Sequence, residues 1–172
     1  MLKKIAITLI LLLLLGCTNV SKKDEYVSEN EKLLIEKIDN WELEDAESLY
    51  IEIRPILTPT KSHKYKTLIS EKDQEKEELT KLIEKLKLAF SKNQIFIIER
   101  YTKKGFKNKM KLRELEKYDF SNGNIYTGKP EFQGEQAKVL TLFNYYDESL
   151  YLDIVFTLDN GQWKIVEFNE RG

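Results

Sequence analysis

The spacing of apolar residues predicts a helical region followed by a region of strands. Between residues 70 and 90, apolar side chains recur at intervals of i, i+3, i+4, i+7 and i+11, namely Leu79, Leu82, Ile83, Leu86 and Phe90. This spacing places them on one side of a helix. Acidic residues fill its first half and lysines its second half, which suits the helix dipole. A short buried helix is expected next, at residues 95–98, and one more helical turn around Leu112 and Leu115.

Two shorter helical patterns occupy residues 29–54. Leu34 and Ile38 lie on the face of the first, and Leu43, Ala46 and Tyr50 continue on the second. They predict a helical hairpin. Two prolines at positions 55 and 59 are expected to end the hairpin, because proline lacks an amide hydrogen and disfavours helix before it. Residues 29–69 are therefore predicted to form a hairpin and a linker, with the single histidine, His63, in a solvated loop of that linker.

The last third of the chain alternates apolar and polar residues, which predicts an antiparallel sheet. Asp159-Asn160-Gly161-Gln162 is a strong signal for a two-residue hairpin, because asparagine and glycine tolerate positive φ. It is predicted to pair Leu158 with Trp163 and Val155 with Val166. A second hairpin around Asp147-Glu148 is predicted to pair Tyr145 with Leu150. An earlier strand, residues 124–133, contains Pro130 and is expected at an edge or a bulge.

These pairings assign the strand residues to two faces. The face expected to meet the helices carries Ala137, Val139, Thr141, Phe143, Tyr145, Leu150, Leu152, Ile154, Phe156, Leu158, Trp163 and Ile165. The opposite face carries five further apolar residues, Leu140, Leu142, Val155, Val166 and Phe168. So much apolar surface is seldom left in water. We expect the N-terminal hairpin, a second protomer or a partner protein to cover it.

The N-terminus has the pattern of a targeting segment. Two lysines precede an apolar run from Ile5 to Leu15, and a helix of that length spans only about 16 Å, too short for a hydrocarbon core of about 30 Å. The run ends in Leu14-Leu15-Gly16-Cys17, which resembles the lipobox of bacterial lipoproteins. The resemblance implies that residues 1–16 are a signal peptide and that Cys17 is acylated. The protein would then be anchored by lipid in the bacterial cell envelope, at the outer membrane if the cell has two membranes. Residues 17–28 are polar and are expected to form a flexible tether.

Residues 73–169 resemble the nuclear-transport-factor-2-like superfamily, and in particular its small cystatin-like lipoproteins. The resemblance rests on the helix, the short helix and an antiparallel meander ending in the segment from Leu158 to Val166. It implies an α+β fold for residues 70–172, cone-shaped, with a pocket between helices and sheet. The superfamily includes isomerases, dehydratases, cyclases and non-catalytic binding proteins, so the fold does not decide the activity. In this pocket we expect Thr141 and Tyr145, with no carboxylate or histidine to act as a general base.

Composition narrows the possible chemistry further. The chain has 28 basic and 29 acidic residues and a single cysteine. One cysteine allows no intrachain disulfide and no thiolate zinc cluster. We expect no cofactor, no metal and no catalytic residue, and the balanced charge gives no reason to expect nucleic acid.

One segment departs from this balance. Between residues 100 and 113 there are seven basic residues and no acid, namely Arg100, Lys103, Lys104, Lys107, Lys109, Lys111 and Arg113. This run is either a solvated loop or a contact with an anionic membrane or cell-wall surface. The sequence thus favours a non-catalytic binding or assembly module, with membrane contact through Cys17 and an envelope protein or a homo-oligomer as possible partners. The alternative is a small pocket enzyme of isomerase or hydrolase type.

Overall fold

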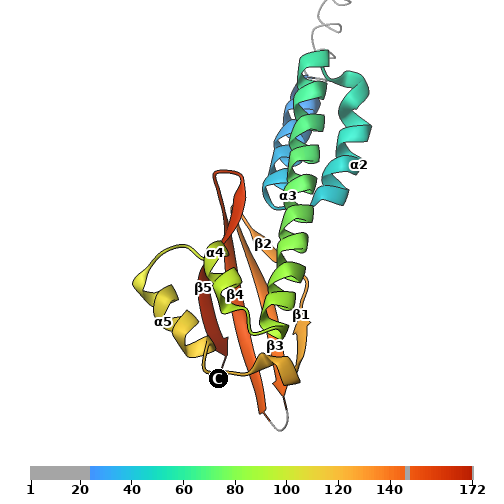
Figure 1. Cartoon of the computed structure of the whole chain (residues 1–172). Coiled ribbons are helices and arrows are strands. Elements are labelled where there is room, and N and C mark those ends of the chain that lie inside the picture. The colour runs from blue at the N-terminus through green and yellow to red at the C-terminus, as the bar shows by residue number, and fades with distance from the viewer. Residues whose placement is uncertain (1–23, 146–147, 172) are drawn as a thin grey trace, which may run out of the picture. The chain divides into compact units, whose positions relative to one another are not determined.

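The computed structural model describes residues 24–145 and 148–171 of the chain (Figure 1). Its class is α+β, as predicted, with helices preceding an antiparallel sheet. The chain divides into two compact units, and the division falls between Ser70 and Glu71.

Unit 1 is helical. Residues 24–39 form a helix, followed by α2 (Leu43–Ile53), the short 3-10 helix η1 (Arg54–Ile56) and the start of α3 (Pro59–Ser91). The expected pair of helices is therefore present. Its core consists of buried side chains from all three α-helices, namely Leu34, Ile38, Ala46, Tyr50, Ile53 and Tyr65.

Two predicted boundaries in unit 1 are wrong. Residues 24–28, expected in the flexible tether, are already helical. Residues 59–69, expected as a linker, belong to α3. Proline is compatible with the first turn of a helix, whose amide hydrogens have no partner within the helix. The Thr58 hydroxyl accepts a hydrogen bond from the Lys61 amide at 3.4 Å, as an N-cap does. His63 accordingly lies on the exposed side of a helix rather than in a loop.

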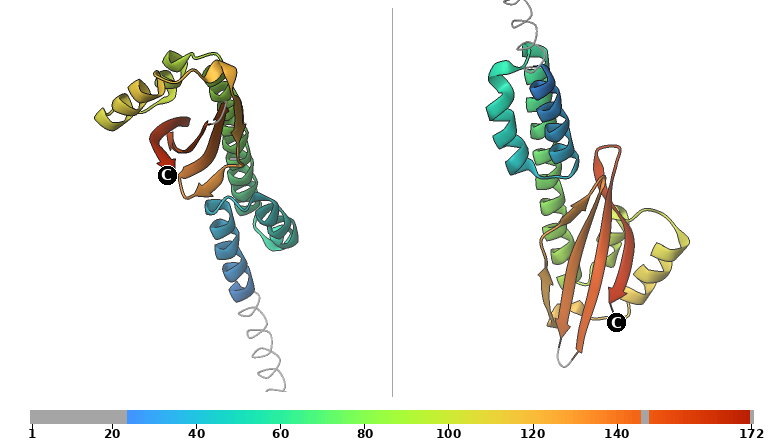
Figure 2. Two further views of the ribbon diagram at one scale, coloured as in Figure 1. Left: turned by 90° about the horizontal axis from the view of Figure 1, so that it is seen from below. Right: turned by 180° about the vertical axis from the view of Figure 1, so that it is seen from behind.

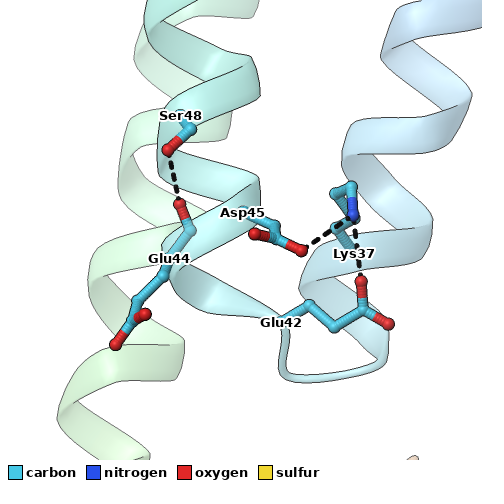
Figure 3. A network of polar contacts seen from close by, with 5 residues as sticks. All are labelled: Lys37, Glu42, Glu44, Asp45 and Ser48. Atoms are coloured by element: carbon cyan, nitrogen blue, oxygen red, sulfur yellow. Dashed lines mark hydrogen bonds and ion pairs between the residues drawn. The ribbon is translucent and has the colours of Figure 1, made fainter.

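The turn between the first helix and α2 is held by an ion-pair network (Figure 3). The Lys37 ammonium lies 3.0 Å from a carboxylate oxygen of Glu42 and 3.2 Å from one of Asp45. Hydrogen bonds from Lys37 to these two carboxylates raise its pKa above the ordinary lysine value. Within this turn Trp41 has a positive φ of 63° and is nevertheless buried.

Unit 2 combines the rest of α3 with α4 (Ile95–Tyr101), α5 (Phe106–Leu115), the 3-10 helix η2 (Phe120–Asn122) and the sheet. The strands are β1 (Asn124–Thr127), β2 (Glu131–Gln133), β3 (Gln136–Tyr145), β4 (Glu148–Asp159) and β5 (Gln162–Arg171). The sheet has the order β1-β3-β4-β5, and β2 also pairs with β3. Figure 2 shows that this sheet is curved. The expected short helix is confirmed as α4, which buries Ile95 and Ile98.

The core of unit 2 lies between α3 and one face of the sheet. Phe90 of α3 is in edge contact with Phe143 of β3, with ring centroids 4.8 Å apart. Phe120 of η2 contacts both of these rings, at 5.4 and 4.7 Å. The Trp163 indole nitrogen donates a hydrogen bond of 2.8 Å to the backbone carbonyl of Glu75. These contacts attach the strands to the helix at points far apart in the sequence.

The predicted strand pairing is correct in part. The hairpin at Asn160-Gly161 pairs Leu158 with Trp163 as expected. Between β3 and β4, however, Tyr145 pairs with Glu148 rather than with Leu150, a shift of two residues. A shift of two leaves every side chain on its expected face. The predicted strand at residues 124–133 is instead two short strands, with Pro130 between them.

A β-bulge in β5 overturns the predicted place of Phe168. Val155 pairs with Glu167, not with Val166, and Ile154 pairs with Phe168. The extra residue in β5 changes the face of the residues that follow it. Phe168 therefore lies on the core face and is only 8% exposed, whereas it was expected on the opposite face.

Candidate functional site

The lipidation residue expected from the lipobox-like segment, Cys17, lies outside the described residues. In residues 24–145 and 148–171, no helix is long and apolar enough to cross a membrane. The same residues contain no cluster of three or more histidine, cysteine, aspartate or glutamate side chains that could hold a metal ion.

The space between α3 and the sheet is almost completely filled. The cavity there has a volume of about 10 Å³ and is lined by apolar residues with Lys87, Thr127 and Thr141. Thr141 is only 2% exposed. The side chain of Tyr145, the other residue expected in this pocket, lies outside the described set. A cavity of this size holds about one water molecule, so the described residues leave no room here for a substrate.

The opposite face of the sheet is partly covered. Leu140, Leu142, Val155 and Val166 are half-buried, whereas Tyr151 is exposed. Asp153 lies among them and forms an ion pair of 2.8 Å with Arg171. The prediction that the N-terminal hairpin or a partner covers this face stays a prediction.

The basic run is part of a folded element rather than a long loop. Arg100 lies in the last turn of α4, Lys103 and Lys104 lie in the connection, and Lys107, Lys109, Lys111 and Arg113 lie on α5. All of these residues are exposed except Lys111, which is half-buried. The structure therefore places the seven charges on two adjoining helices and the turn that joins them.

Between these two helices is a groove, which we call the α4–α5 groove. Its volume is about 640 Å³, and its walls include Phe96, Arg100, Lys104, Phe106 and Lys109, with Leu112 also in the lining. Phe106 is 80% exposed and Phe96 56% exposed. The Arg100 guanidinium lies 5.6 Å from the centre of the Phe96 ring, as in a cation–π contact. The groove therefore combines exposed aromatic surface with positive charge.

Contacts to β5 fix the two helices on the sheet. Thr102 forms a parallel bridge with Ile165, and the Lys103 amide donates a hydrogen bond of 2.7 Å to the Ile165 carbonyl. Lys103 also forms an ion pair of 3.3 Å with Asp159. These contacts hold the connection between α4 and α5 on a strand whose position the core determines.

Lys111 fixes α5 in a similar way. Its ammonium lies 2.9 Å from Glu170 of β5 and 3.1 Å from Glu114 of α5. Partial burial lowers the pKa of Lys111, but the hydrogen bonds to these two carboxylates outweigh it, and the net pKa is raised. Lys111 is thus a structural cation. No ion pair joins Lys104, Lys107, Lys109 or Arg113 to another described residue, so their charges remain available to a ligand.

A second polar pocket lies on the other side of the α4 C-terminus. It has a volume of about 410 Å³ and is bounded by Lys81 and Lys85 of α3, Tyr101 of α4, and Trp163 and Lys164 of β5. We call it the Tyr101 pocket. No pattern along the sequence indicates this pocket, because its residues come from three segments that are far apart in the chain. Only strand register and helix packing could reveal that Lys85 and Lys164 lie on the same tyrosine.

Comparisons with protein-family models, with curated proteins and with solved structures give no significant match to this chain.

Proposed function

We propose that the protein is a lipid-anchored module of the bacterial cell envelope, which binds an anionic membrane surface through the α4–α5 groove without catalysing a reaction. The lipobox-like segment ending at Cys17 supports the anchor. Acyl chains contribute about 0.8 kcal/mol per buried methylene, and two chains hold a protein stably on a bilayer. The resemblance to nuclear-transport-factor-2-like lipoproteins is compatible with a non-catalytic role.

The observation that carries the proposal is the composition of the groove. Its lining includes two exposed phenylalanines together with Lys104 and Lys109, which pair with no described carboxylate. One acid, Glu99, belongs to the same lining. Basic residues near an anionic bilayer contribute about 1 kcal/mol each. Aromatic side chains are favoured at the boundary between headgroups and hydrocarbon. The two kinds of side chain together suit a lipid surface.

A purely hydrophilic wall polymer would use the charges but not the phenylalanines. Phe106 is 80% exposed, and contact with lipid would remove its ring from water. The alternative, a small pocket enzyme, is less well supported, because the cavity beneath α3 measures only about 10 Å³. We therefore favour the membrane surface.

Vesicle binding tests the proposal. The protein to use is the mature chain from residue 17 with Cys17→Ser, which has no acyl chain and keeps every described residue. Lys104 and Lys109 line the groove, and Lys107 lies beside them on α5. Replacing these three lysines with glutamine should weaken binding to vesicles rich in phosphatidylglycerol at least tenfold, since each charge contributes about 1 kcal/mol. Phe106→Ser should also weaken binding. Added salt should weaken wild-type binding, because exposed charges are screened over about 8–10 Å.

A matched control removes the same charge elsewhere in unit 2. Lys76, Lys92 and Lys129 are exposed and lie outside the groove lining, so their replacement with glutamine should change vesicle binding less than twofold. Equal losses of vesicle binding in the two triple variants would mean that binding depends only on the net charge of the protein. Absence of wild-type binding at low salt would refute the proposal.

A further inference from the structure

The Tyr101 pocket brings two ammonium groups onto one aromatic ring. Lys85 lies 5.0 Å from the centre of the Tyr101 ring, and its ammonium donates a hydrogen bond of 2.6 Å to the Tyr101 hydroxyl. Lys164 approaches the same ring at 5.7 Å. Both ammonium groups thus border the same tyrosine. Because like charges repel, an anion bound beside the Tyr101 hydroxyl would be attracted to both.

The hydrogen-bonding capacity of the pocket points the same way. The Tyr101 hydroxyl accepts from Lys85, so its own proton can still be donated, and no described residue accepts it. Neither Lys85 nor Lys164 forms an ion pair with a described carboxylate. Gln162 adds an amide at the rim. Apart from the Glu78 carboxylate, the polar side chains that line the pocket can donate hydrogen bonds, as an oxyanion requires.

The nearby acids do not neutralise the two central lysines. Glu77 pairs with Lys81 at 2.8 Å. Glu78, which is part of the pocket lining, accepts a hydrogen bond of 3.2 Å from Gln74 and forms no ion pair with Lys85 or Lys164. These two lysines are therefore the cations of the lining that no described carboxylate pairs. Leu82 and Trp163 supply an apolar wall next to them, against which the organic part of a ligand can pack.

We propose that the Tyr101 pocket binds a phosphate monoester, with Lys85, Lys164 and the Tyr101 hydroxyl contacting its oxygens. A phosphate monoester carries nearly two negative charges at neutral pH and has several strong acceptor oxygens. It therefore matches two ammonium groups better than a carboxylate does. The volume of about 410 Å³ is within the usual range for small-molecule sites. This site is separate from the α4–α5 groove and does not depend on the proposed membrane contact.

Calorimetric titration of the mature Cys17→Ser chain tests the site, with inorganic phosphate, glycerol 3-phosphate and acetate as probes at constant low ionic strength. Wild type should bind both phosphates more tightly than acetate. Lys85→Met and Lys164→Met should each weaken phosphate binding at least tenfold, because each removes a charged hydrogen bond. Tyr101→Phe keeps the ring and should cause a smaller loss. Lys76→Met, on the same helix but outside the pocket lining, is the matched control and should bind like wild type.

Vesicles containing phosphatidic acid, compared with phosphatidylglycerol at equal charge, identify the source of the phosphate. Preference for phosphatidic acid that requires Lys85 and Lys164 indicates a lipid headgroup. Binding of glycerol 3-phosphate without that preference indicates a soluble ester. Failure of wild type to bind any phosphate probe would overturn the proposal. So would acetate binding as tight as phosphate binding. A loss of phosphate affinity in Lys76→Met equal to that in the two pocket variants would overturn it as well. The groove variants should lose vesicle binding but keep phosphate binding. That result would show that the two sites act independently.

Discussion

At the scale of single residues, Trp41 occupies an unusual backbone position. It lies in the turn after the first described helix with φ of 63°, where glycine or asparagine is usual. The left-handed region costs a side chain of this kind about 1–2 kcal/mol. Its indole is nevertheless buried, and removing a large aromatic residue from a core costs about 3–5 kcal/mol. The free energy gained by burying the indole therefore exceeds the cost of the backbone conformation.

This comparison predicts the effect of Trp41→Gly. The substitution relieves the backbone but loses the buried ring, so it should lower the free energy of unfolding by about 1–4 kcal/mol. Denaturant unfolding followed by circular dichroism measures the change. Trp41→Phe, which keeps an apolar ring, should lose less. A variant with glycine that is more stable than wild type would mean that strain dominates at this turn.

Asp119 offers a prediction about pH. Its carboxylate accepts hydrogen bonds from Ser121 and from the Asn93 amide, and the Asn93 carbonyl oxygen accepts the Phe120 amide at 2.8 Å. The bonds from Ser121, then that from Asn93, lower the pKa of Asp119 below its ordinary value of 3.8. A lowered pKa means that the carboxylate stabilises the fold above that ordinary value, and that this contribution is lost as the pH falls through the lower folded value.

The stability difference between wild type and Asp119→Asn should therefore shrink as the pH falls below 3.8. Unfolding curves at several acidic pH values test this. A direct measurement of the side-chain carboxyl by nuclear magnetic resonance should give a pKa below 3.8. A measured pKa at or above that value would contradict the role assigned to these hydrogen bonds.

At the scale of elements, Phe168 shows which features a sequence pattern can and cannot reveal. Alternation assigns the described side chains of β3 and β4 to their correct faces, because a slip of two residues preserves those faces. A bulge adds one residue and reverses the assignment beyond it. No residue type near Val166 marks this event, since valine, glutamate and phenylalanine are all compatible with a regular strand. The bulge becomes visible only when Ile154 is seen opposite Phe168.

The corrected position predicts that Phe168 is a core residue. Phe168→Ala should lower the free energy of unfolding by about 3 kcal/mol or more. Tyr151→Ala is the matched control, since Tyr151 is an exposed aromatic residue on the neighbouring strand, and it should cost less than about 1 kcal/mol. Equal losses of stability in the two variants would contradict the placement of Phe168 on the core face.

Helix boundaries were harder to predict than helices. The amphipathic stripe from Leu79 to Phe90 was sufficient to predict the second half of α3. The prediction omits the first half because it places the end of the preceding hairpin at Pro59, although Thr58 and Pro59 together are a good helix start. A proline can follow the end of one helix or stand in the first turn of the next, and the sequence pattern around Pro59 is compatible with both.

At the scale of the whole molecule, the candidate site was only partly accessible to sequence analysis. The basic run is contiguous in the chain, so its charge could be counted directly. That the run flanks a groove with Phe96 depends on the packing of α4 against α5, and the Tyr101 pocket depends on three distant segments. Sequence patterns report charges along one element well. They do not report distances between elements.

The proposed location of the whole molecule depends on a single sulfur atom. Cys17→Ser should abolish lipidation and leave the protein unprocessed or released from the membrane. Metabolic labelling with a palmitate analogue, followed by fractionation of the cells, tests this prediction. Equal labelling of wild type and variant would rule out Cys17 as the acylation site.

The two edges of the sheet also affect how copies of this protein interact when they are crowded. At one end β1 and β2 are short and Pro130 interrupts them; at the other, β5 carries a bulge and is bridged by Thr102. Short strands, prolines, bulges and covering segments all hinder the addition of a foreign strand. Acyl anchoring would concentrate the protein in two dimensions, where encounters between sheet edges are frequent. The blunted edges should then keep neighbouring copies from joining into a continuous sheet.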